Sequence, residues 1–105
     1  IHHGGHGSCM TGLCAGTPAV IIPTYSERES NARRVAAMGA GDVVLLSETG
    51  PGEKRVSVEE LRAKVRQVLS DPSFRLNAGR IAESIRTYGG ASEAARLIDN
   101  FAAGL

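Results

Sequence analysis

The chain has 105 residues, a formal net charge of +1 and 22% charged residues. These values are typical of one globular domain, and the mixed charges contain no basic block that would predict a nucleic-acid partner. The longest apolar run, residues 19–22, is too short to span a bilayer, and the N-terminus lacks the pattern of a signal peptide. We therefore predict a cytoplasmic protein without a membrane span.

A glycine-rich segment at residues 2–8 opens the chain and reads His-His-Gly-Gly-His-Gly-Ser. Its glycines let the backbone come close to a ligand, and a short helix is predicted to follow. The N–H groups at the start of a helix bind anions, with the positive end of the helix dipole behind them. His3, His6 and Ser8 add side-chain donors at the same point. The segment therefore predicts a phosphate-binding loop.

The same segment allows two other interpretations. One is a tight turn without a ligand, and the other is a metal site, because His2, His3, His6 and Cys9 are potential zinc ligands. Their spacing follows a glycine turn rather than a ligand cage, which disfavours the metal. We expect His2 to pack rather than to bind, because it faces away from His3 if the strand continues through it. Cys9 and Cys14 are predicted to be reduced, small core residues.

Short apolar runs alternate with helical patterns over residues 1–46. The predicted elements are a strand of which only Ile1 remains, a helix with Met10, Leu13 and Cys14 on one face, a strand at 19–22, a helix at 26–38 that begins with a capping box at Ser26, and a strand at 43–46. This order predicts parallel strands with crossover helices, an α/β Rossmann-like fold. Because the first strand is reduced to one residue, we expect the chain to be a C-terminal piece of a longer one.

The rest of the chain is predicted to be an exposed loop at 47–55 and a helical tail at 57–105. Capping residues at Ser57, Asp71 and Ser92 predict three helices, the second with proline at its first position. The stripes expected to be buried are Leu61, Val65, Val68 and Leu69, then Phe74, Ala78, Ile81 and Ile85, then Ala94, Leu97, Ile98 and Phe101. Residues 1–105 are thus expected to form part of one domain.

Polar residues at 23–28 follow the second predicted strand. Ligands of parallel sheets bind beyond the carboxyl ends of the strands, so we expect this segment and the glycine-rich segment to be neighbours. The carboxylate of Glu27 can accept hydrogen bonds from sugar hydroxyls, and Arg28 can pair with an anion. That Glu27 only starts the helix is an equally open interpretation.

Four segments, His3–Ser8, Ala15–Pro18, Pro23–Arg28 and Asn31–Gly41, resemble the C-terminal signature of the nucleotide-sugar-dependent GT-B glycosyltransferases. That family includes the UDP-glycosyltransferases and the bacterial macrolide and antibiotic glycosyltransferases, and residues 61–72 are similar to its last helix pair. The resemblance implies the C-terminal part of a GT-B donor-binding domain. The whole enzyme would be inverting and would move a sugar from a nucleoside diphosphate, UDP or dTDP, to an acceptor hydroxyl.

The resemblance also implies roles for individual residues. The donor diphosphate would be held by His3, the N–H groups around Gly5, His6 and Gly7, and the Ser8 hydroxyl. Thr11 takes the ribose position, where many members have glutamate. Glu27 and Arg28 take the sugar position, where members usually have Asp-Gln. No metal is implied, because oriented donors can neutralise the phosphates, and the resemblance implies no cofactor. It implies no catalytic residue in this chain either.

The implied partners are the nucleotide-sugar donor and a small acceptor molecule held by an N-terminal domain, which would also supply the catalytic base. The chain alone is therefore expected to be inactive. Two other functions stay open: a small donor-binding subunit that acts with a partner chain, and a noncatalytic anion-binding or metal-binding module. The oligomeric state is also open, a homodimer included.

Overall fold

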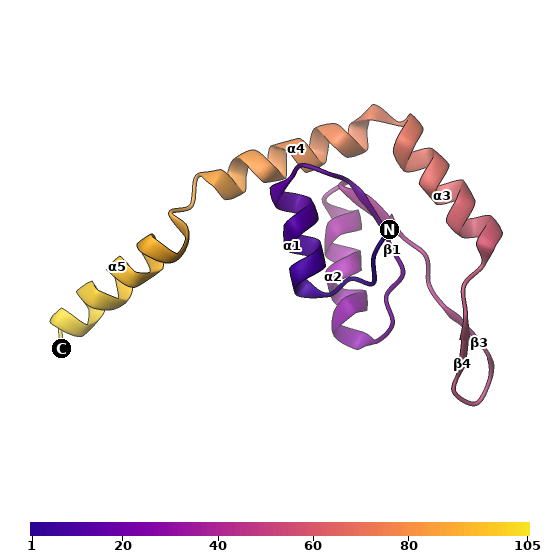
Figure 1. Ribbon diagram of the computed structural model, residues 1–105, viewed down its shortest axis with the longest axis horizontal. Helices are drawn as coiled ribbons and strands as arrows, with labels where there is room; N and C mark the ends of the chain where they lie inside the picture. The colour runs from indigo at the N-terminus through magenta and orange to yellow at the C-terminus, as the bar shows by residue number, and fades with distance from the viewer.

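The computed structural model describes the backbone of residues 1–105 and every side chain except that of Ser26. Two parallel strands alternate with helices in the first part of the chain, and a hairpin and three helices follow (Figure 1). In chain order the elements are α1 (His6–Cys14), β1 (Ala19–Ile21), α2 (Ser26–Ala37), β2 (Gly41–Val43), β3 (Ser47–Gly50), β4 (Glu53–Arg55), α3 (Val58–Ser70), α4 (Pro72–Arg86) and α5 (Gly90–Ala103).

β1 lies in the middle of the parallel sheet. It pairs with β2, with Ile21 opposite Val43, and on its other side Ile21 forms a parallel bridge with His2. Helices α1 and α2 make the crossovers, which confirms the predicted fold class. The strand predicted at 43–46 lies earlier, at Gly41–Val43, so the prediction and β2 share only Val43. A Cβ at Gly41 would lie 2.1 Å from the Ala19 carbonyl oxygen, so glycine allows the pairing to start there.

Both faces of this sheet are covered. On one face Ile21 packs with buried residues of α1, α2 and α4, and on the other Val20 packs with Val44 and with Val68 of α3. Successive residues of a strand point to opposite faces, so the neighbouring residues Val20 and Ile21 belong to two different core clusters. A strand buried on both faces is typical of a parallel sheet with helices on each side.

Two helix starts are stabilised as the sequence predicts. The Ser57 side chain accepts a hydrogen bond from the Glu60 N–H at 3.2 Å, and the Asp71 carboxylate accepts one from the Ser73 N–H at 2.9 Å. Pro72 occupies the first turn of α4. This bond from the Ser73 N–H lowers the pKa of the Asp71 carboxyl below its ordinary value. The predicted cap at Ser26 lies outside the described side chains.

Residues 47–55 form an antiparallel hairpin rather than the predicted loop. Glu48 pairs with Lys54, and the turn is made by Pro51 and Gly52, the latter with φ +77°. Proline followed by glycine is as typical of the turn of a hairpin as of a loop. The two strands are polar and show no alternation of apolar residues, so the sequence did not indicate that they pair with each other. The Lys54 amine donates to the Thr24 carbonyl oxygen at 2.9 Å, which ties the hairpin to the segment after β1.

The first helix begins within the glycine-rich segment, earlier than predicted, and its buried face differs from the expected one. α1 starts at His6, with Cys9 and Leu13 buried and Cys14 exposed. Both cysteines are free in the described structure, as expected, but the prediction that Cys14 lies in the core is wrong. Burial raises the pKa of the Cys9 thiol.

The expected burial of the last helix is wrong. α5 begins at Gly90, without a side-chain cap from Ser92, and its apolar residues Leu97, Ile98 and Phe101 are 55%, 69% and 72% exposed. α5 projects from the end of α4 away from the rest of the chain (Figure 1). Leu69 of α3, also expected to be buried, is exposed as well. The apolar stripe of α5 therefore has no packing partner within the described part of the chain.

The overall shape is extended and thin. Its principal extents are 56 × 37 × 17 Å and its radius of gyration is 17.2 Å. A compact chain of this length would have a radius of gyration of about 13 Å. No helix in the described residues is both long enough and apolar enough to cross a membrane. The cytoplasmic location stays a prediction.

Candidate functional site

The glycine-rich segment packs against β1 and α2 through Gly4. This residue is buried and has φ +87°, a conformation that favours glycine. A Cβ there would lie 2.8 Å from the Arg28 carbonyl oxygen and 3.0 Å from the Ile21 side chain. The two segments that were predicted to be neighbours therefore meet at Gly4 and Arg28.

His3 is held by the backbone of its own loop. The Gly5 N–H donates to His3 Nδ1 at 3.0 Å, and a Cβ at Gly5 would lie only 2.4 Å from His3 Cε1. In a neutral imidazole one nitrogen accepts and the other donates, so the proton lies on Nε2. His3 is exposed, so this donor belongs to a side chain that is accessible to solvent. The Gly5 N–H is used in the same bond, so it is already occupied within the chain.

The start of α1 carries the other donors. Among the described groups, no acceptor is found for the N–H groups of His6, Gly7 and Ser8, and Gly5 provides no side-chain cap. Backbone donors at a helix N-terminus attract anions. A Cβ at Gly7 would meet nothing within 4 Å, so packing does not require this glycine. A glycine inside a helix lowers the stability of the fold by about 0.5–1 kcal/mol relative to alanine. Close approach of a ligand is therefore the favoured explanation for a glycine at position 7.

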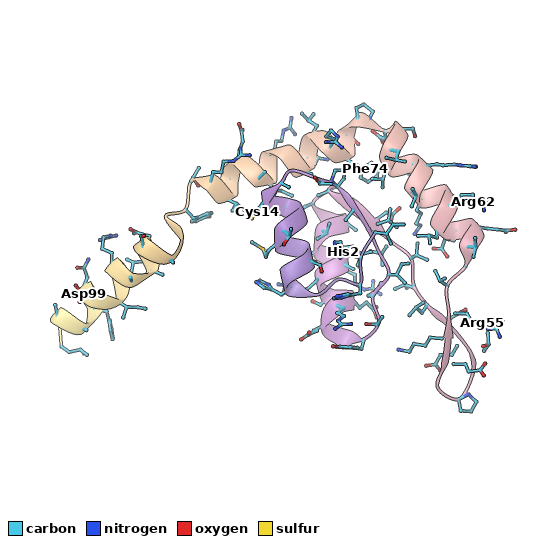
Figure 2. All side chains as sticks on the ribbon, viewed as in Figure 1. His2, Cys14, Arg55, Arg62, Phe74 and Asp99 are labelled. Atoms are coloured by element: carbon cyan, nitrogen blue, oxygen red, sulfur yellow. The ribbon has the colours of Figure 1, made fainter. Side chains whose placement is uncertain are left out.

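His2 supports the loop from the inside. Its Nδ1 accepts a hydrogen bond from the Gly4 N–H at 3.0 Å, and the side chain is half-buried. Burial lowers the pKa of His2 below its ordinary value, and the neighbouring His3 lowers it further. His2 lies near the start of α1, at the opposite end of that helix from Cys14 (Figure 2). As expected, it packs beneath the loop and holds Gly4.

The described residues contain no group of three or more histidine, cysteine or acidic side chains placed to hold a metal ion.

Thr11, predicted at the ribose position, is exposed one turn after Gly7. Its hydroxyl donates to the Gly7 carbonyl oxygen at 2.8 Å, which leaves its lone pairs available as acceptors.

The sugar-position residues lie on the first turn of α2. The Arg28 guanidinium donates to Thr24 Oγ1 at 2.6 Å and lies 4.1 Å from the centre of the Tyr25 ring. The contact with the ring is a cation–π interaction, so the charge of Arg28 is held against its own loop. The Glu27 side chain on the same turn is exposed. The structure thus brings Arg28 beside the glycine-rich segment at Gly4, and Glu27, next to it on the same turn, is the more accessible of the two.

Sequence reasoning assigned no role to Asn31, although it contacts the loop directly. Its amide nitrogen donates to the Gly4 carbonyl oxygen at 2.9 Å, across 27 residues of sequence. Asn31 lies one turn after Glu27 and Arg28 on α2, and residues three and four apart share a helix face. That spacing is the signal in the sequence that places Asn31 on the same face of α2 as Glu27 and Arg28.

A comparison with protein families identifies the fold of this site. Residues 1–99 match the family described as "Erythromycin biosynthesis protein CIII-like, C-terminal domain". The chain belongs to this family. The match covers nearly the whole chain and confirms the resemblance to macrolide and antibiotic GT-B glycosyltransferases. The glycine-rich segment, β1 and the start of α2 all lie within the matched CIII-like C-terminal domain.

Curated relatives of this CIII-like domain are glycosyltransferases. Demethyllactenocin mycarosyltransferase of Streptomyces fradiae is 35% identical over 99 residues, which cover 94% of the chain and 20% of the relative. The NDP-glycosyltransferase YjiC of Bacillus licheniformis is 36% identical over 103 residues, 98% of the chain and 24% of the relative. The chain therefore spans about a fifth to a quarter of the length of these relatives.

Solved structures agree with the family. The glycosyltransferase of kitacinnamycin has a TM-score of 0.77 at 30% identity, covering 93% of this chain and 24% of that one. The Streptomyces glycosyltransferase SsfS6, solved in complex with thymidine diphosphate, has a TM-score of 0.75 at 31% identity, covering 94% and 24%. These likenesses confirm that the CIII-like domain has the fold of the C-terminal part of GT-B glycosyltransferases.

Proposed function

We propose that this chain is the donor-binding part of a longer inverting glycosyltransferase that uses a nucleoside diphosphate sugar. The observation that carries the proposal is that the exposed His3 ring and the N–H groups without an acceptor at the start of α1 belong to the same glycine-rich segment. Several donors in one segment support an anion of more than one oxygen as the ligand. The thymidine diphosphate complex of SsfS6 supports a diphosphate as that anion.

In the proposed reaction an acceptor hydroxyl attacks the anomeric carbon of the sugar and the bond from that carbon to the diphosphate breaks. The proton of the hydroxyl passes to a base in another domain, and negative charge develops on the leaving diphosphate. His3, the Ser8 hydroxyl and the N–H groups of His6 and Gly7 stabilise this charge. Preorganised donors of this kind act where charge develops and require no metal ion or cofactor.

The nucleoside and sugar are assigned to the two neighbouring positions. Thr11 accepts from the ribose hydroxyls, and Glu27 accepts from hydroxyls of the sugar. Arg28 stands beside Glu27 and stabilises the sugar-binding turn through Thr24 and Tyr25. In this proposal the base and the acceptor site belong to another domain, so the chain binds the donor without catalysing transfer by itself.

The decisive variant is His3→Ala in the full-length protein. Removing one donor to a developing charge lowers turnover by roughly 100-fold or more, so we expect kcat to fall by that amount with dTDP-sugar or UDP-sugar as donor. Cys14→Ala, at the exposed far end of α1, is the matched control and should leave kcat unchanged. Equal kcat for His3→Ala and wild type would contradict the proposal.

Calorimetry with dTDP and UDP, each with and without a chelator, tests the donor site independently of turnover. We expect metal-independent binding. Binding that requires a metal, or no binding of either nucleotide, would favour a noncatalytic module instead.

A further inference from the structure

Both backbone polar groups of Gly4 are held by side chains. Its N–H donates to His2 Nδ1 at 3.0 Å, and its carbonyl oxygen accepts from the Asn31 amide at 2.9 Å. The first bond comes from the same loop, whereas the second comes from α2. Asn31 is half-buried, so its hydrogen bond is partly shielded from water.

The Gly4 carbonyl and the Gly5 N–H belong to one planar peptide group. On one side this group accepts from Asn31, and on the other it donates to His3 Nδ1 at 3.0 Å. The three groups therefore form a continuous series from the Asn31 amide through the peptide to the His3 ring. Hydrogen bonds in series polarise one another, so the bond from Asn31 strengthens the donor that fixes His3.

The peptide between Gly4 and Gly5 is also the one in this loop that could rotate most easily. Glycine allows positive and negative φ almost equally, so residues on both sides of the peptide oppose rotation weakly. If the peptide turned over, the Gly5 N–H would point away from His3 Nδ1. The ring would then lose the bond that keeps its proton on Nε2.

We propose that Asn31 is a positioning residue that sets the orientation and tautomer of His3 through the Gly4–Gly5 peptide. The inference rests on the proposed function of His3 as a contact of the donor diphosphate. Asn31 itself does not touch the donor in this arrangement. Its effect on the reaction passes through His3, which distinguishes it from a residue that only stabilises the fold.

The chain offers a matched control in Asn77. Its amide nitrogen donates to the Gly39 carbonyl oxygen at 3.3 Å, across 38 residues, and Gly39 has φ +71°. This is the same chemistry, an asparagine amide on a glycine carbonyl in a left-handed conformation. It joins α4 to the end of α2 and has no connection to the glycine-rich segment.

The test compares Asn31→Ala with Asn77→Ala in the full-length protein. Nitrogen NMR of the His3 ring reports the tautomer, and we expect Asn31→Ala to convert a ring protonated at Nε2 into a mixture of tautomers while Asn77→Ala leaves it unchanged. Affinity for dTDP or UDP should fall about tenfold in Asn31→Ala, the loss of one hydrogen bond, with little change for thymidine or uridine. Asn77→Ala should change neither.

A double variant separates a positioning role from a general one. If Asn31 acts through His3, adding Asn31→Ala to His3→Ala should weaken dTDP binding no further. The same tenfold loss in both backgrounds, or an unchanged His3 ring spectrum in Asn31→Ala, would overturn the inference. Unchanged dTDP and UDP binding in His3→Ala would instead overturn the proposed function, and the ring spectrum would still decide whether Asn31 positions His3.

Discussion

The two ends of the chain use similar apolar patterns with opposite results. Ile21 of β1 is completely buried between helices, whereas Ile98 of α5 is 69% exposed. An apolar stripe predicts that a face can be buried, but the burial requires a partner surface. β1 has neighbouring strands and helices on both faces, and the described chain supplies no such partner for α5.

This difference also separates the site from the tail. The glycine-rich segment is held by β1 on one side and by α2 on another, through Gly4 and Asn31. Binding groups on a rigid support keep their geometry, and loops next to a packed sheet are frequent binding positions. Among the described residues, the side-chain hydrogen bonds and ion pair of α5 are local and join Arg96 to Glu93 one turn earlier.

An isoleucine-to-alanine substitution in each region tests directly whether the two regions differ in packing. Ile21→Ala should lower the free energy of unfolding by about 2–5 kcal/mol, because it leaves a cavity in the core. Ile98→Ala should change it by less than about 0.5 kcal/mol, because the side chain is exposed. Urea unfolding of the chain measures both, and equal losses would show that α5 is as well packed as β1.

A second pair of variants sharpens the comparison within the site. Gly4→Ala should destabilise the fold by about 1–3 kcal/mol, because the residue has φ +87° and its Cβ would collide with Arg28. Gly7→Ala should leave stability equal or higher, because Gly7 is helical and faces open space. Thermal unfolding compares them, and calorimetry with dTDP should show weaker binding by Gly7→Ala despite its intact fold.

A Gly7→Ala protein as unstable as Gly4→Ala would contradict the view that Gly7 serves the ligand. Unimpaired dTDP binding by a stable Gly7→Ala protein would contradict it too.

The smallest expected effect concerns pH. The pKa of His2 is lower in the folded chain than its ordinary value of 6.5, chiefly because of burial. Between the lowered pKa and pH 6.5 the unfolded chain therefore binds more protons than the folded chain. The contribution of His2 to the free energy of unfolding is complete above pH 6.5 and is lost as the pH falls through this range. Unfolding curves at about pH 7.5 and about pH 5 should differ less for His2→Phe than for wild type. The same difference in both proteins would exclude His2 as the cause.

Much of the packed region could be predicted from the sequence because its signals are local. Pro72 and the capping residue Ser57 mark helix starts whatever else the chain does, and the β-branched run at 19–22 suits a strand buried on both faces. The hairpin and the exposed α5 could not be predicted in this way. The first depends on pairing between polar strands, and the second depends on whether a partner surface exists.

The candidate site was predictable as a set of residue types but not as an arrangement. Glycines, His3 and Ser8 before a helix predict an anion site because helix starts carry unpaired donors. The roles of Gly5 and Asn31 depend on a hydrogen bond within the loop and on another that joins residues 27 apart. Sequence periodicity does not report which carbonyl a distant amide will reach.

The bond from the Gly5 N–H to His3 has a consequence for the entropy of binding. Immobilising a flexible side chain on binding costs about 0.5–1.5 kcal/mol. Because the His3 ring is already fixed to its loop at 3.0 Å, that ordering takes place when the chain folds. Under the proposed function, a donor that reaches this loop would meet an imidazole whose conformational freedom was lost beforehand, and more of the interaction energy would remain for affinity and for the departing diphosphate.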